Sequence, residues 1–376
     1  MLPSVRDTHA AYLAGVLGVA ALCAGVLVAP ACSGDDPSEE PSGSTSTGAP
    51  GVGGAGGSAP GSGGDSPGIG GGLQPGTGGQ GGGESCFDTL PTPVGAEAVL
   101  APGVEGLYTA YDLGPVPGVP QARLGGCVIR HDDPNTLLIA AGSETADGAI
   151  YSIGVTRGPC GHITGFAGTA TLVATTPYVD ANLVYGPNDV LFYTAYPVNQ
   201  ISQLLPGASA PAVTTSGYAI GITQGGSVSG FGFVPPELDA AGAPRAITWS
   251  NGDWYRMTMS AAGEVFTLAN ATRQVTLPNG PGGFAYIPAG SPGFSAPGLI
   301  VAEWSTNTVG TYDVDAQGDP LPDTRKDFFT TFPRPWGAYF EPATGDFLFL
   351  TWGAATDRVY IVQGFAPPPP PPPPPQ

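Results

Sequence analysis

The chain has 376 residues and a formal net charge of −19, although only 11% of its residues are charged. From Phe87 onward there are 23 acidic side chains against 10 basic ones, and Lys326 is the one lysine of the whole protein. Proteins that bind nucleic acids or anionic membrane surfaces concentrate basic residues against phosphate groups. The composition therefore argues against both as partners.

The first 31 residues have the pattern of an export signal. Arg6 is followed by an apolar run from Ala10 to Val28 without a charged side chain, and small residues then precede Cys32. A short apolar core that ends in small residues indicates a cleavage site. The run is long enough to span a bilayer, but no Lys or Arg follows it as a stop signal. We therefore predict a signal peptide over 1–31 rather than a transmembrane helix.

This segment resembles a bacterial lipoprotein signal. The resemblance implies that Cys32 carries a lipid on its thiol and becomes the mature N-terminus, although Ala29 stands where the family prefers Leu. Cys23 is a poorer candidate, because the preceding Leu22 is too bulky for the family's cleavage position. Ser33 after the lipid cysteine implies transfer to the outer membrane. We expect an exported protein of the cell envelope that is bound to the membrane through Cys32.

A tether is predicted over residues 32–86. Residues 33–85 contain 21 glycines and almost no large apolar side chain. Such a segment cannot bury enough surface to offset the entropy of ordering its backbone, so we expect it to be disordered. A Gly-rich coil of this length reaches roughly 40 Å and would hold the domain predicted over 87–366 clear of a membrane.

The predicted domain is built from short runs rich in β-branched and aromatic residues that are broken by Gly, Pro, Asn and Asp. This pattern is typical of many antiparallel strands. A common unit recurs five times, and each unit has a turn proline after its first strand. Successive turn prolines are 53, 48, 53 and 54 residues apart: Pro134, Pro187, Pro235, Pro288 and Pro342. Aromatic residues stand two positions before four of them: Tyr185, Phe233, Tyr286 and Phe340.

The fourth unit is the clearest. Its four strands are expected over residues 283–287, 299–304, 309–314 and 328–332. The fifth unit has three expected strands and no fourth one before the chain ends. Residues 106–113 are expected to supply that strand from the N-terminal side.

Three or four strands at a period near 50 residues are typical of β-propeller blades. Each blade has two apolar faces, which it can bury only against neighbouring blades in a ring. We predict an all-β fold: a β-propeller with five clear blades, and a degenerate sixth before residue 126 remains open. A β-sandwich is the alternative, but it does not predict five matching units.

Residues 282–320 and 336–365 resemble secreted bacterial propellers of the NHL-like group. The closest resemblance is to surface proteins with an exosortase (PEP-CTERM) sorting signal. In these proteins a sequence segment like residues 340–349 forms part of the end of the domain. This chain departs at its end, because prolines 367–375 and Gln376 stand in place of the sorting helix. Residues 367–376 are expected to form a polyproline II rod, either as a spacer or as a docking segment for a partner.

Three cysteines follow the predicted signal and lipid site. Export implies an oxidising compartment in which one disulfide is plausible. We predict a bridge between Cys127 and Cys160, which both fall in the first unit, with Cys86 as an alternative partner of Cys127. The sequence contains no CxxC motif, so a zinc site is not expected.

Several polar residues are candidates for a site. The spacing of three acidic residues is like that of the ligands in a calcium loop: Asp313, Asp315 and Asp319. A hairpin turn explains them equally well. Calcium is the one cofactor that we consider. His131, Asp132 and Asp133 are interpreted as a turn, although a base or cation ligands would also fit. His162 is expected in a loop. Glu303 is expected either to face the channel as a ligand or to face solvent, and the second is favoured.

Two functions are consistent with these patterns. The first is a monomeric, surface-tethered propeller that binds an unknown protein or carbohydrate, with no catalytic residue assigned. Trp249, Trp254, Trp304, Trp336 and Trp352 could form a binding face, although core packing is favoured for most of them. The second is a divalent-metal-dependent hydrolase of the lactonase type. A catalytic role is the less favoured of the two.

Overall fold

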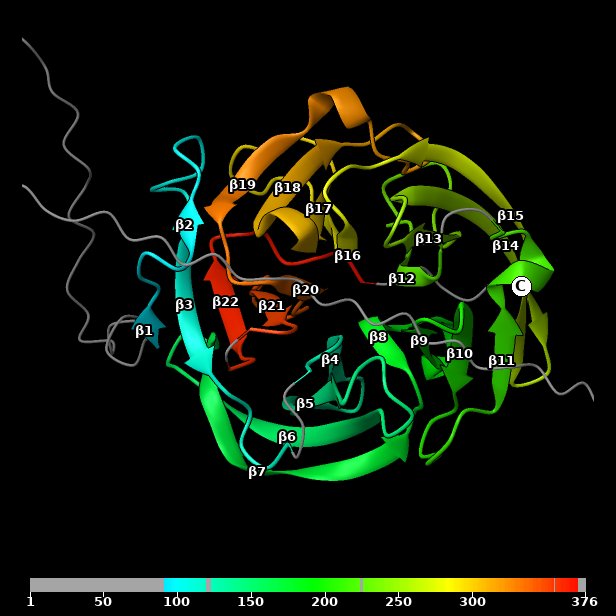
Figure 1. Ribbon diagram of the computed structural model, residues 1–376. Helices are drawn as coiled ribbons and strands as arrows, with labels where there is room; N and C mark the ends of the chain where they lie inside the picture. The colour runs from blue at the N-terminus through cyan, green and yellow to red at the C-terminus, as the bar shows by residue number, and fades with distance from the viewer. Residues whose placement is uncertain (1–90, 120–122, 224–225, 355, 371–376) are drawn as a thin grey trace, which may run out of the picture. The chain divides into compact units, whose positions relative to one another are not determined.

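The computed structural model describes residues 91–119, 123–223, 226–354 and 356–370. The predicted signal peptide, the tether, Cys23, Cys32 and Cys86 lie outside these residues. Within them, no helix is long and apolar enough to cross a membrane. The described chain folds into five antiparallel sheets arranged as blades around a central axis (Figure 1).

The first three blades each contain four strands in consecutive order. Blade 1 contains β4 (Cys127–Arg130), β5 (Asp133–Ala141), β6 (Ala149–Arg157) and β7 (Ile163–Thr175). Blade 2 contains β8 (Val179–Tyr185), β9 (Leu191–Ala195), β10 (Gln200–Leu204) and β11 (Val213–Ser216), with η1 (Pro187–Asp189) after β8 and α1 (Gly217–Ile220) after β11. Blade 3 contains β12 (Val228–Phe233), β13 (Pro244–Thr248), β14 (Asp253–Ala262) and β15 (Val265–Thr276).

The last two blades each take strands from both ends of the domain. Blade 4 contains β16 (Pro281–Ile287), β17 (Gly298–Glu303), β18 (Thr308–Asp313), β19 (Lys326–Thr331) and β2 (Val99–Leu100), with η2 (Trp304–Thr306) and η3 (Pro322–Thr324) in its connections. Blade 5 contains β20 (Pro335–Phe340), β21 (Phe347–Thr351), β22 (Val359–Gln363), β3 (Thr109–Gly114) and β1 (Thr92–Pro93).

The predicted all-β propeller is confirmed, and the open question of a sixth blade is answered: the described residues form five. Ring closure also follows the prediction, because β3 pairs antiparallel with β22 over Thr109 to Gly114 and completes blade 5 from the N-terminal side. A second closure had no counterpart in the sequence pattern: β2 adds to β19 at the outer edge of blade 4.

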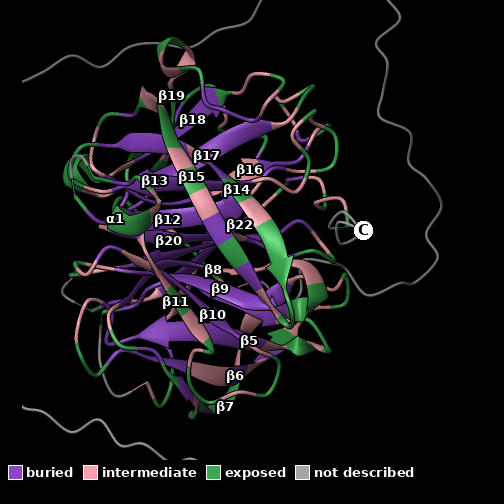
Figure 2. Ribbon diagram, turned by 90° about the vertical axis from the view of Figure 1, so that its right-hand side faces the viewer, coloured by how far each residue is buried: buried purple, intermediate pink, exposed green. Residues whose placement is uncertain are grey.

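Each pair of neighbouring blades encloses its own apolar cluster. Successive side chains of a strand point to opposite faces of its sheet. In β5, Leu137 and Ile139 therefore pack toward blade 5, whereas Leu138 and Ala140 pack toward blade 2. The five clusters correspond to the five blade interfaces. Figure 2 shows buried residues throughout the blades and exposed residues on the long β14–β15 hairpin.

The innermost strands come so close at the axis that several positions have no room for a side chain. A Cβ atom on Gly126, directly before β4, would lie 2.4 Å from the backbone nitrogen of Leu183 in β8. One on Gly337 of β20 would lie 2.2 Å from the carbonyl oxygen of Gly125. Real Cβ contacts are never this short, so these glycines are required by the convergence of the blades.

Asn182 of β8 connects three other blades across the axis. Its Nδ2 donates to the carbonyl oxygens of Phe284 (3.3 Å) and Ala338 (3.2 Å). Its Oδ1 accepts from the backbone N–H groups of Phe231 (3.3 Å) and Phe284 (3.2 Å). The side chain is buried, so a single amide satisfies four backbone groups that no neighbouring strand reaches.

We predict that Asn182→Leu lowers the free energy of unfolding by at least about 2 kcal/mol, because each buried backbone group left without a partner costs about 1–3 kcal/mol. Urea denaturation followed by tryptophan fluorescence measures the change. Asn251→Ala at an exposed turn is the matched control. Equal stabilities of the two variants would contradict the role given to Asn182.

Candidate functional site

The two ends of the ring differ in the loops that form them. The leading end, where each innermost strand begins, also carries the loops between the second and third strands of each blade, because antiparallel neighbours reverse direction. The trailing end carries the turns between the first and second strands. In blade 4, for example, Pro281 at the start of β16 pairs with Glu303 at the end of β17. Trp304 therefore stands at the leading end.

An aromatic arc follows the leading end through four blades. In each of blades 2 to 5, the residue directly after the second strand is aromatic: Tyr196, Trp249, Trp304 and Trp352. The ring centroids of successive members lie 6.0, 5.8 and 5.7 Å apart, in edge-to-face geometry. All four side chains are half-buried. The arc is therefore a repeated feature of the blades with part of its surface open to solvent.

Blade 1 interrupts the arc with polar residues. Gly142, Ser143 and Glu144 occupy the corresponding loop. Next to this loop lies Asp180 at the start of β8, whose Oδ1 accepts a 2.8 Å hydrogen bond from the Trp336 indole. The Trp336 ring lies 6.0 Å from that of Trp352. Two carboxyl groups thus stand where the aromatic arc is open.

Burial shifts both carboxyl groups toward their protonated form. Burial raises the pKa of Glu144 to about 7, against the opposing effect of the positive Arg123. Burial, followed by repulsion from Glu144, raises the pKa of Asp180 well above its usual value, although the hydrogen bond from Trp336 acts in the other direction. Glu144 also has a positive φ of 62°, a conformation that costs a non-glycine residue energy and clusters at functional sites.

Two arginines cover indole faces of the arc. The guanidinium of Arg334 lies 4.3 Å from the ring centroid of Trp304, and that of Arg123 lies 5.4 Å from that of Trp352. Neither forms an ion pair with a carboxylate among the described residues. Their charges are held by cation–π contacts at the rim.

Unpartnered buried polar atoms concentrate at this end. Six buried side-chain nitrogen or oxygen atoms of the described residues lack a hydrogen-bond partner, and five of the six belong to the leading end: Ser143 Oγ, Thr176 Oγ1, Asp180 Oδ2, Trp249 Nε1 and Trp352 Nε1. Buried polar groups in folded proteins are nearly always satisfied. Such a concentration indicates a place where a ligand or water completes the bonding.

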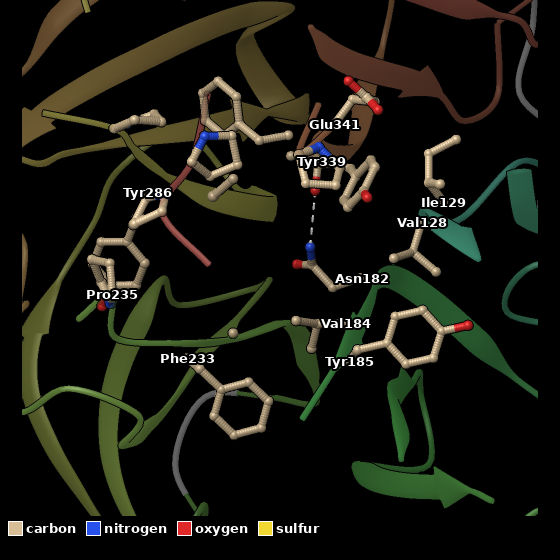
Figure 3. A pocket seen from close by; sticks show the side chains of 18 of the residues that line it. Val128, Ile129, Asn182, Val184, Tyr185, Phe233, Pro235, Tyr286, Tyr339 and Glu341 are labelled. Atoms are coloured by element: carbon tan, nitrogen blue, oxygen red, sulfur yellow. Dashed lines mark hydrogen bonds between the residues drawn. The ribbon is translucent and has the colours of Figure 1, made fainter. Parts of the chain in front are cut away.

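The trailing end contains a cavity of about 580 Å³. The C-terminal halves of the five innermost strands line it, and Asn182 lies in its middle (Figure 3). Its lining includes four of the repeated turn prolines: Pro134, Pro235, Pro288 and Pro342. It also includes the four aromatic residues that stand two positions before a turn proline: Tyr185, Phe233, Tyr286 and Phe340. The wall is therefore mainly apolar.

The predicted calcium ligands do not form a common site. Asp319 is buried and accepts hydrogen bonds from Arg245 (2.9 Å), Trp254 (3.0 Å) and Arg256. Asp315 caps its own turn and contacts Arg256 at 3.3 Å, and Asp313 is exposed. Within the described residues, no group of three or more His, Cys, Asp or Glu side chains is placed to hold a metal ion. Guanidinium groups take the cationic role instead.

Glu303 neither faces the channel as a ligand nor faces solvent. It is fully buried and accepts hydrogen bonds from Arg325 (2.8 and 2.5 Å), Tyr312 (2.8 Å), Asn279 (3.0 Å) and Thr308 (2.8 Å). Both sequence interpretations of Glu303 are therefore wrong, because an arginine distant in sequence neutralises it inside blade 4.

His131 and His162 lie in turns, as the sequence suggests. Asp133 caps the β4–β5 turn through Asn135 N and Thr136 Oγ1, and His131 lines the trailing cavity.

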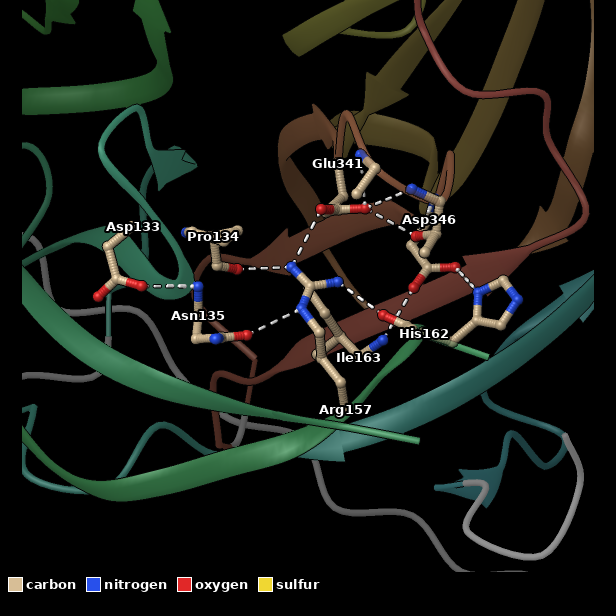
Figure 4. A network of polar contacts seen from close by, with 11 residues as sticks. Asp133, Pro134, Asn135, Arg157, His162, Ile163, Glu341 and Asp346 are labelled. Atoms are coloured by element: carbon tan, nitrogen blue, oxygen red, sulfur yellow. Dashed lines mark hydrogen bonds and ion pairs between the residues drawn. The ribbon is translucent and has the colours of Figure 1, made fainter. Parts of the chain in front are cut away.

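His162 lies in the β6–β7 turn and reaches Asp346 of blade 5 at 2.6 Å. Beside it, Arg157 contacts Glu341 at 3.0 Å (Figure 4). These contacts join blade 1 to blade 5.

The predicted Cys127–Cys160 disulfide is wrong. Cys127 is a free, buried thiol, so it has no disulfide with Cys86 either. Cys160 is disulfide-bonded, but not to Cys127. The physical reason is position: Cys127 lies in the innermost strand of blade 1 and packs in the core, whereas exposed Cys160 lies in the hairpin between the third and fourth strands.

The five tryptophans divide between two roles. Trp254 is fully buried core, and Trp336 is buried beside Asp180. Trp249, Trp304 and Trp352 form the arc. The sequence contains a signal for this arc, since an aromatic residue follows the second strand of four successive units, but that signal is visible only once the strand ends are fixed.

Comparison with known proteins assigns no family and no activity to this chain. No protein-family model matches the chain, and no curated protein matches it. Among solved structures, the PQQ-bound aldose sugar dehydrogenase of Streptomyces coelicolor is 12% identical, with 73% of this chain and 94% of that chain covered and a TM-score of 0.37. An auxiliary nutrient-binding protein of Bacteroides ovatus is 10% identical, with 68% and 76% covered and a TM-score of 0.40. These values transfer no activity, and the fold assignment depends on the strand pairing itself.

The raised carboxyl pKa values predict a pH-dependent stability. Glu144 has a pKa of about 7 in the folded chain against 4.5 without the fold, so the folded state binds more protons between these values. Stability should be greatest near pH 4.5 with respect to this group and should fall as the pH rises through 7. In Glu144→Gln the fall should shrink, as measured by urea denaturation between pH 5 and 8. Exposed Glu237→Gln is the control, and an unchanged slope in Glu144→Gln would contradict the assignment.

Proposed function

We propose that this chain is an exported lipoprotein whose propeller binds a saccharide at the leading end of its ring. The lipid would be on Cys32, residues 32–86 would be the tether, and the outer membrane would be the anchoring surface. The observation that carries the binding proposal is the concentration of unpartnered buried polar atoms beside the aromatic arc.

The kinds of unpartnered atoms favour a hydroxyl-rich ligand. The indole Nε1 groups of Trp249 and Trp352 only donate. Burial raises the pKa of Asp180, so its Oδ2 donates when the carboxyl is protonated and accepts when it is ionised. The hydroxyl groups of Ser143 and Thr176 both donate and accept. A polyhydroxylated molecule matches the whole set in either protonation state of Asp180, because each of its hydroxyl groups also donates and accepts.

The aromatic arc fits the same ligand class. Half-buried indole faces provide apolar surface next to polar groups, and tryptophan combines such a face with an N–H donor. A sugar ring has both kinds of surface. Arg123 and Arg334 at the rim add donors that no carboxylate of the described residues occupies.

A protein partner is less well supported. The exposed large hydrophobic residues of the described chain are Val99, Leu107, Leu172, Tyr218 and Leu321. They stand singly on different blades or connections, and scattered residues of this kind are normal on monomer surfaces.

A metal-dependent hydrolase of the lactonase type is the other candidate. It would need several oxygen ligands that converge in the channel. Within the described ranges, the carboxylates that could serve are paired with arginines or separated. A binding role is therefore preferred. The resemblance to secreted NHL-like surface propellers agrees with a domain held outside the cell.

We predict that a glycan array probed with the purified mature chain identifies a bound saccharide. Trp249→Ala should weaken its binding about tenfold or more, because burying a large apolar side chain contributes about 1.5–3 kcal/mol. Trp249→Phe should weaken binding less, since it removes only the indole donor. Isothermal calorimetry with the identified saccharide measures both variants.

Tyr218→Ala, an exposed aromatic residue on α1, is the control and should bind like the parent chain. The absence of any bound glycan, or equal affinities for Trp249→Ala and Tyr218→Ala, would contradict the proposal.

Lipidation is tested separately. Cells grown with an alkyne-labelled fatty acid should label the parent chain, which should sediment with membranes. Cys32→Ser should remove both the label and the sedimentation, because the thiol is the attachment point. Cys23→Ser should change neither. A labelled Cys32→Ser chain would overturn the assignment of the anchor.

A further inference from the structure

The cavity at the trailing end has an unusual wall. Prolines from four blades and phenylalanine or tyrosine residues from four of the five innermost strands surround it. Its tyrosine hydroxyls already have partners; that of Tyr286, for example, donates to the carbonyl of Gly318 at 2.7 Å. None of the unpartnered buried polar atoms of the described chain belongs to this lining. The cavity therefore offers mainly apolar contact, with side chains such as Arg130 and Glu341 as the polar part of its lining.

The chain itself leads into this cavity after its last strand. Phe365 is buried in the cluster between blades 4 and 5, and the Ala366 N–H donates to Ser291 Oγ at 3.1 Å. Pro368 and Pro369 then form part of the cavity lining. Both are half-buried, whereas the flanking Pro367 and Pro370 are exposed. Figure 1 shows the red segment beyond β22 crossing the ring toward β16.

We propose that the trailing cavity is a binding site for a polyproline II segment, and that the resting occupant is the proline run of this chain, residues 367–375. This site is distinct from the saccharide site, because Asn182 fills the axis between the two ends. The proposal does not depend on the function assigned to the leading end.

The chemistry of proline suits this wall. Proline has no backbone N–H, so it enters an apolar cavity without leaving a donor unpaired. A polyproline II helix is already extended and loses little entropy on docking, and aromatic-lined grooves are the surfaces that recognise it. Tyr185, Tyr286 and Tyr339 provide such rings. Anchoring of the chain at Phe365 and Ala366 keeps the run next to the cavity at a high effective concentration.

The test compares the full chain with a chain in which prolines 367–375 are replaced by alternating Ser and Gly. A fluorescent nonaproline peptide is titrated into both, and fluorescence anisotropy is measured. We expect the replaced-tail chain to bind the peptide and the full chain to bind it about tenfold more weakly or not at all, because the tethered tail competes at an effective concentration on the order of millimolar.

A second pair of variants locates the binding. Val184→Trp fills the cavity from β8 and should abolish peptide binding to the replaced-tail chain, whereas Leu172→Trp on the exposed outer strand β7 should not. Circular dichroism confirms that each variant is folded. The proposal is overturned if the peptide binds neither chain, binds both equally, or still binds the Val184→Trp chain. Retention of glycan binding by all these variants keeps the result separate from the saccharide proposal.

Discussion

The structure depends on the convergence of five innermost strands at one axis. Their backbones approach until a Cβ on Gly126 or Gly337 would clash with the next blade, and Asn182 bonds the backbone groups that remain at the centre. This closes the channel in its middle. The two ends then become separate surfaces with different loops, one with an aromatic arc and carboxyl groups, the other with a proline-lined apolar cavity.

Buried charges in this domain mainly join loops and strands to one another. Arg245 and Arg256 reach Asp319 from blade 3 to blade 4, and Arg157 and His162 reach Glu341 and Asp346 from blade 1 to blade 5. Breaking one partner of such a pair leaves an uncompensated buried charge, which is far more costly than the pair is stabilising. Acidic residues that look like cation ligands in the sequence therefore serve as partners for the few arginines of the domain. The carboxyl groups of Asp180 and Glu144 differ, because no guanidinium is within ion-pair distance of either among the described residues.

The sequence predicts the fold because each turn proline follows the end of an innermost strand by one to four residues, and the alternation of apolar and polar residues within each strand can be read from a short stretch of sequence. It also predicts a closing strand within residues 106–113, since an incomplete fifth blade needs one, and the structure places that strand at Thr109–Gly114. The absence of a Cys127–Cys160 bridge was not predictable, because two cysteines of one unit can lie far apart in a blade, one before or in the innermost strand and the other in an outer hairpin. The leading-end residues were missed for a related reason: Glu144 lies in a loop of blade 1 and Asp180 in β8 of blade 2, and only the ring brings them together.

We propose that a saccharide satisfies the unpartnered buried atoms of the leading end. The five indole N–H signals of a proton–nitrogen correlation spectrum report on this directly, since the chain has five tryptophans. On addition of the bound saccharide, the signals of Trp249 and Trp352 should shift most as their N–H groups gain an acceptor. The signal of Trp254, already bonded to Asp319, should stay in place. A bound saccharide that leaves the Trp249 and Trp352 signals unchanged would contradict the account.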